Sequence, residues 1–154
     1  MPHYYFEDCV VGESRSFGQY EVTRESVLAF ARQFDPQPFH LDDEVAAKTP
    51  FGRLAASGWH TCAMTMRMMV EHWTAIGLES LGSPGLEDLR WLKPVYPGDI
   101  LHVHYECLDR RPSLSRPDIG LVKGAWRTVN QDDVTVCSFT ATTMVRRRPA
   151  PGRT

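Results

Sequence analysis

The longest apolar segment of the chain runs from Ser57 to Gly77 and reads SGWHTCAMTMRMMVEHWTAIG. Its apolar residues recur at helical spacing and form one stripe, made of Trp59, Cys62, Ala63, Met66, Val70 and Trp73. Three methionines, Met64, Met68 and Met69, occupy much of the remaining surface. Because a helix that is apolar nearly all round is buried on most sides, we expect a long buried helix. It opens at Ser57 and Gly58 and ends at Gly77, where glycine permits a left-handed cap.

The period of the apolar positions changes to 2 after Gly85, which is typical of half-buried strands. Long antiparallel strands are predicted at residues 86–95, 99–110, 119–130 and 134–147, with short strands near 3–6 and 14–22. The prolines of the segment 110–118 predict a loop there. A sheet wrapped around the helix would bury the helix and leave one sheet face outside, which is an α+β architecture.

Length and charge narrow the class of protein. The chain has 154 residues and a formal net charge of −2, which favours one domain over residues 1–154 and argues against nucleic-acid binding. Its only low-complexity stretch, residues 146–154 (RRRPAPGRT), is expected to be a loose tail. No stretch resembles a membrane span or a secretory leader. We therefore expect a cytoplasmic protein without a membrane role, in which the four cysteines are reduced and buried.

A proline-rich corner follows a predicted helix over residues 23–34, for which Thr23 is the N-cap. The corner reads Asp35-Pro36-Gln37-Pro38-Phe39-His40, and its prolines stop the helix and stiffen the bend. Asp42 then caps a second short helix. A carboxylate and an imidazole held five residues apart could converge on one water molecule, one accepting its proton and the other returning a proton elsewhere. The alternative is that Asp35 caps a turn and His40 bonds to the backbone.

The start of the long helix is the second candidate element. The first amides of a helix are unpaired and carry partial positive charge, so a developing oxyanion is stabilised there. Gly58 has no Cβ and would let an acyl carbonyl approach its N–H, with Ser57 and Trp59 as candidates for lining the pocket. Equally, Gly58 would serve close packing of the helix. The two readings remain open.

The order of the motifs resembles the MaoC-like dehydratase family. The motifs are FA at residues 30–31, DPQPFHLD at 35–42, a Pro-Phe-Gly turn at 50–52, LAASGWHT at 54–61 and LKPVYPGDIL at 92–101. The resemblance as a whole spans about Tyr20 to Val145. The resemblance implies a hotdog fold, in which a curved antiparallel sheet wraps a long central helix. It also implies enoyl-CoA hydratase or 3-hydroxyacyl-thioester dehydratase activity and a homodimer. The substrate would be an acyl-CoA or acyl-carrier thioester, and neither a cofactor nor a metal is required.

Carried onto this chain, the resemblance assigns the catalytic pair to Asp35 and His40 and the oxyanion-binding amide to Gly58. Better-known hydratases of the family have His directly before this glycine and Ser further into the helix, whereas this chain has Ser57 and Ala63. Two alternatives therefore stay open, an acyl-CoA thioesterase on the same fold and a non-catalytic acyl-thioester-binding subunit. The only acid within the helix is Glu71, several turns from Gly58, which argues against hydrolysis.

Other polar groups give weaker signals. His102 and His104 share one face of a predicted strand, but no further ligand is signalled nearby, so we expect no metal site. Arg53, Arg90 and Lys93 could meet coenzyme A phosphates, although solvated charge is the simpler reading for each.

Overall fold

The computed structural model describes residues 3–152. Its elements in chain order are η1 (Phe6–Asp8), β1 (Ser14–Glu21), α1 (Arg24–Phe34), η2 (Pro38–His40), α2 (Asp43–Ala47), α3 (Gly58–Ile76), β2 (Leu86–Trp91), β3 (Ile100–Pro112), β4 (Ile119–Val129) and β5 (Thr135–Arg146), where η marks a 3-10 helix.

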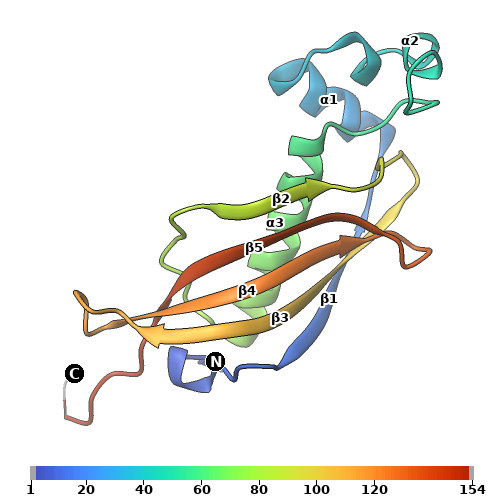
Figure 1. The fold of residues 1–154 in the computed structure, drawn as a ribbon. Coiled ribbons are helices and arrows are strands. Elements are labelled where there is room, and N and C mark those ends of the chain that lie inside the picture. Colours follow the sequence, from blue (N-terminus) through green and yellow to red (C-terminus); the bar gives the residue numbers. More distant parts are fainter. Residues whose placement is uncertain (1–2, 153–154) are drawn as a thin grey trace.

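One antiparallel sheet curves around α3. The strand order is β1-β3-β4-β5-β2, so β1 and β2 are the two edges. In Figure 1 the sheet lies across α3, while α1 and α2 stand beyond the end at which α3 begins. The hotdog fold and the α+β class are therefore confirmed. The loop between β3 and β4 is shorter than predicted, because β3 extends to Pro112.

The predicted helix ends are confirmed by hydrogen bonds. The Thr23 side chain accepts from the amide of Ser26, and the Asp42 side chain accepts from the amide of Val45. Each bond satisfies one amide that the first turn leaves unpaired. At the other end of α3, Gly77 has φ 73°, the left-handed conformation that favours glycine.

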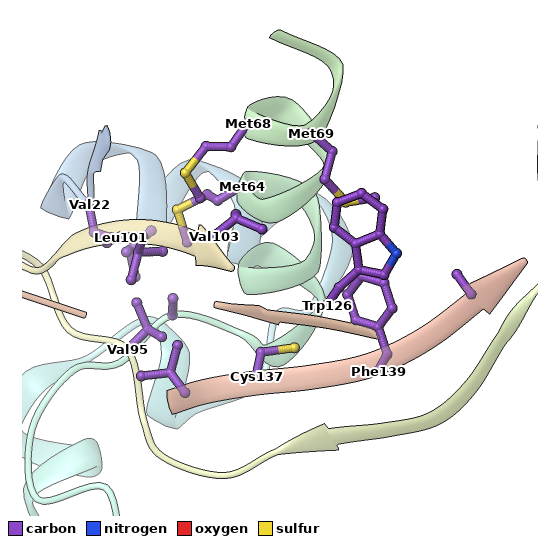
Figure 2. Close-up of a cluster of buried hydrophobic side chains, with 14 of the residues drawn as sticks. Val22, Met64, Met68, Met69, Val95, Leu101, Val103, Trp126, Cys137 and Phe139 are labelled. Carbon is purple, nitrogen blue, oxygen red and sulfur yellow. The ribbon is translucent and has the colours of Figure 1, made fainter. Parts of the chain in front are cut away.

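The core lies between α3 and the concave face of the sheet. Figure 2 shows Met64, Met68 and Met69 of α3 packed toward side chains from the strands and loops. Those neighbours include Val22, Val95, Leu101, Val103, Trp126, Cys137 and Phe139. Of the four cysteines, Cys9, Cys107 and Cys137 are buried and Cys62 is half-buried.

The prediction that the long helix is buried on most sides was wrong, because α3 is buried on one side only. The buried residues of α3 are His60, Thr61, Met64, Thr65, Met68 and Met69. By contrast Trp59, Met66 and Val70, from the predicted stripe, are 59%, 42% and 46% exposed. The buried side also holds two threonines, and their polar groups are paired: Thr65 donates to the carbonyl of Thr61 and contacts the Thr128 hydroxyl. α3 thus has two apolar sides, one packed against the sheet and one exposed to solvent.

The ends of the chain also differ from expectation. In place of a strand at residues 3–6, the segment makes an isolated bridge at Tyr4 and then the 3-10 helix η1, held by the Asp8 side chain on the Tyr5 amide. The segment expected to be loose begins with Arg146 inside β5. Arg147 and Arg148 then pair with Glu7 and Asp8, so these residues are attached to η1, while residues 153–154 lie outside the described part.

Among residues 3–152, no helix is long and apolar enough to cross a membrane.

Candidate active site

A cavity of about 390 Å³ lies at the N-terminal end of α3. Asp35, His40, Ser57, Gly58 and Trp59 all line it, although they come from two separate segments. The corner after α1 supplies the acid and the imidazole, and the opening of α3 supplies the other three. The structure therefore brings the two candidate elements of the sequence to one place.

Asp35 is held where α1 ends. It is the C-cap residue, its amide bonds to the carbonyl of Ala31 at 2.9 Å, and Pro36 prevents the helix from continuing. Its carboxylate accepts two hydrogen bonds, from Ser57 Oγ at 2.7 Å and from Gln37 Nε2 at 2.8 Å. Partial burial alone would raise the pKa of Asp35, but these two donors and the nearby His40 outweigh it and hold the pKa below its ordinary value of 3.8. Asp35 is therefore charged at neutral pH.

His40 is buried, and its ring orientation is fixed from behind. Nδ1 lies 2.9 Å from the carbonyl oxygen of Ala55. Since a carbonyl only accepts, Nδ1 carries the proton, and in the neutral ring Nε2 is the free acceptor. Nε2 lies 3.4 Å from Oδ2 of Asp35. A water molecule at the cavity side of this pair would meet two acceptors, one for each of its hydrogens.

The opening of α3 presents donors to the same cavity. The first intrahelical bond runs from the Thr61 amide to the Ser57 carbonyl. Among residues 3–152 no side chain caps this end, and no acceptor contacts the amides of Gly58 and Trp59. Because the helix dipole places partial positive charge here, the amides suit a negatively polarised oxygen.

Gly58 also has a packing role. A Cβ at this position would lie 2.5 Å from two ring atoms of Trp91, so the indole occupies the space that glycine leaves. The packing reading of Gly58 is thus supported by contact. This packing leaves the Gly58 backbone N–H in place, so the role of that N–H as a donor to an oxyanion stays a prediction.

Among the further lining residues, Trp91, Lys93 and Val136 were not predicted as site residues. Trp91 is the last residue of β2 and Lys93 lies two positions beyond it, where the amides of Leu92 and Lys93 both donate to the carbonyl of Val136. Val136 is the extra residue of a β-bulge, because Thr128 and Val129 of β4 pair with Cys137 and Thr135. A strand-period pattern gives no signal for such a bulge. β2 stops short of the predicted residue 95 at this junction.

The weaker candidates lie elsewhere. Glu71 is paired with Arg67 on the exposed side of α3, about 20 Å along the axis from Gly58 at 1.5 Å per residue. His102 contacts the Gly18 carbonyl, and His104 contacts Ser16. In the described part of the chain no three His, Cys, Asp or Glu residues form a group that could hold a metal ion.

The profile of the family described as "MaoC like domain" matches residues 8–118. A Bacillus subtilis protein, the uncharacterized YdeM, is 28% identical over 141 residues, which cover 92% of this chain and 98% of that protein. A 3-hydroxybutyryl-CoA dehydratase from Methylorubrum extorquens is 30% identical over 113 residues, 73% of this chain and 69% of the relative.

A crystal structure of a MaoC-like dehydratase from Rhodospirillum rubrum has the same fold. It superposes with a TM-score of 0.83 at 43% identity, covering 96% of this chain and 99% of the other.

Proposed function

Because the chain belongs to the MaoC-like domain family, we propose that it is a hydro-lyase that adds water to, or removes it from, an acyl thioester. One observation carries the proposal: the cavity that holds the Asp35 and His40 acceptors 3.4 Å apart also holds the uncapped amides of α3. Hydration of an enoyl thioester needs both parts, a site that binds and deprotonates water and a donor for the thioester oxygen.

In the hydration direction, Asp35 and His40 hold a water molecule against C3 of the enoyl thioester. As the water oxygen attacks C3, Asp35 accepts a proton and the C2–C3 π electrons move toward the thioester oxygen. The amide of Gly58 stabilises that oxygen while it is enolate-like. His40, with Nδ1 held on the Ala55 carbonyl, orients the water through Nε2, and this nitrogen then takes the proton from Asp35 and delivers it to C2. Both side chains then return to their starting states, and dehydration uses the same steps in reverse.

The proposed substrate class rests on two points, the thioester oxygen that the amides at the start of α3 would bind and the name of one relative. We propose a coenzyme A or acyl-carrier thioester, since one relative is named a 3-hydroxybutyryl-CoA dehydratase. Lys93 lines the cavity, so it is a candidate contact for the anionic carrier.

The test is an absorbance assay. The protein is incubated with crotonyl-CoA and with longer and branched enoyl-CoAs, and loss of the enoyl absorbance is followed. Asp35→Asn and His40→Ala are each expected to lower the rate at least about a hundredfold, the low end of general acid–base contributions. Asp42→Asn is the matched control, because asparagine caps α2 as well as aspartate does and Asp42 does not line the cavity.

The outcomes separate the three candidate functions. Enoyl absorbance that falls without release of free thiol supports the hydro-lyase, whereas thiol release from an acyl-CoA supports a thioesterase. Ligand binding without turnover supports a non-catalytic acyl-binding subunit. Hydration at an unchanged rate in both cavity variants would refute the roles of Asp35 and His40.

We further propose that the chain is a homodimer. Trp59, Met66 and Val70 form an exposed apolar side of α3, and β2 beside it is an edge strand with unpaired backbone groups. The apolar groove between them has a volume of about 660 Å³ and includes the exposed Leu86 of β2. A second copy related by a two-fold axis would cover this groove with the same surface and pair β2 with β2.

A further inference from the structure

Ser57 occupies a capping position but does not cap. It immediately precedes the first residue of α3, where serine ordinarily accepts a hydrogen bond from a first-turn amide. Here no such bond forms, and the Ser57 hydroxyl donates instead to Oδ2 of Asp35 at 2.7 Å. The residue is 1% exposed. Its hydrogen bond therefore joins α3 to the end of α1 rather than closing α3.

The bond fixes the orientation of the carboxylate. Oδ2, which accepts from Ser57, is also the oxygen that faces Nε2 of His40. The other oxygen accepts from Gln37, which is exposed, so the Ser57 bond is the one shielded from solvent. The charged or titratable groups around Asp35 are His40, at 3.4 Å, and Lys93, which lines the same cavity. In the described part of the chain, no other ionisable side chain pairs with Asp35.

The bond has a second consequence for α3. An N-cap serine accepts from the second or third amide of a helix, so with the Ser57 side chain turned to Asp35 the Trp59 amide stays uncapped beside the Gly58 amide, which such a cap would not engage. Ser57 and Gly58 are consecutive, so one peptide unit sets the spacing between the group that holds the carboxylate and the amide that would receive the acyl oxygen.

We propose that Ser57 is a positioning residue of the reaction: its hydroxyl holds the Asp35 carboxylate beside His40. This inference rests on the proposed function. Ser57 need not touch the reacting atoms, because it acts through Asp35.

The experiment compares Ser57→Ala with Ser57→Thr, which keeps the hydroxyl. In Ser57→Ala the pKa of Asp35 should rise toward its ordinary value, since a donor to the charged form is lost. At neutral pH kcat should fall about tenfold or more, because a hydrogen bond to a charged group is lost. KM should change less, and the acidic limb of kcat/KM should move to higher pH. Ser57→Thr should restore the wild-type acidic limb.

A direct titration separates this inference from the proposed function. The carboxyl ¹³C signal of Asp35, assigned with Asp35→Asn, is followed as the pH is lowered, which requires no turnover. Gln37→Ala, which removes the solvent-exposed donor, should shift the titration less than Ser57→Ala. An unchanged Asp35 titration in Ser57→Ala overturns the inference even if the protein is a hydratase. Should Ser57→Ala not fold, the folded Ser57→Thr protein decides: an Asp35 titration raised above that of the wild type contradicts the role of the hydroxyl.

Discussion

Replacement of Gly58 by alanine tests the contact between α3 and Trp91. The added Cβ would lie 2.5 Å from Cδ2 and Cε2 of the indole, against about 3.5–4.0 Å for relaxed carbon contacts. The rigid ring must therefore move by about 1 Å, and overpacking of this kind costs about 1–3 kcal/mol. The helix preference of alanine returns at most about 1 kcal/mol. With that full return, Gly58→Ala should still lower the free energy of unfolding, by up to about 2 kcal/mol.

The measurement is a double-mutant cycle by urea unfolding, followed by circular dichroism at one protein concentration. In a Trp91→Ala background the clash is absent, so Gly58→Ala should be neutral or stabilising, and the coupling should be about 1–3 kcal/mol. The matched control is Trp59→Ala. The Trp59 ring packs edge-on against Trp91 with 5.2 Å between the ring centroids, but none of its atoms is among the three nearest to a Cβ at Gly58. An equal cost of Gly58→Ala with and without Trp91 would refute the packing role.

Three further predictions concern the dimer, the core and pH. Met66→Glu should convert the proposed dimer to a monomer by light scattering, whereas Leu114→Glu, at a loop residue that is 98% exposed, should not. Thr65→Val should lower the free energy of unfolding in urea by about 1–3 kcal/mol, because it leaves the buried Thr128 hydroxyl without its partner. Thr128→Val, at the other partner of the same bond, should lower it less, because the Thr65 hydroxyl still donates to the Thr61 carbonyl. Asp35 has a lowered pKa in the folded protein, so its charge stabilises the fold above the ordinary pKa of 3.8 and ceases to do so as the pH falls through the folded value. Asp35→Asn should therefore lower Tm near neutral pH and have no effect in stronger acid, and a constant difference by calorimetry would contradict this.

Local signals predicted most of the fold. Thr23, Asp42 and Gly77 mark helix ends through bonds or backbone angles that depend on a few neighbouring residues, and each appears as expected. The buried face of α3 does not follow from local sequence in the same way. Met66 and Met68 are equally apolar, yet only packing against the sheet decides that Met68 is buried and Met66 is exposed.

The candidate site divides in the same manner. The corner around Asp35 and His40 and the start of α3 at Gly58 are contiguous motifs, so the sequence indicated both. Trp91 and Val136 reach the cavity through strand pairing and a bulge, which have no local signature. Ser57 was expected only to line the pocket. Its bond to Asp35 joins residues 22 positions apart in the chain, and no local pattern indicates such a contact.

All the side chains around the cavity except Val136 come from residues 35–95, whereas β3, β4 and β5 begin at Ile100. The chemically active part and the main scaffold are thus consecutive halves of the polypeptide. Exchanging the first of these between two proteins of this architecture should transplant substrate preference while the recipient's three long strands stay paired with one another. The halves must be matched where β2 pairs with β5, where α3 packs against the sheet, and at the bulge that carries Val136.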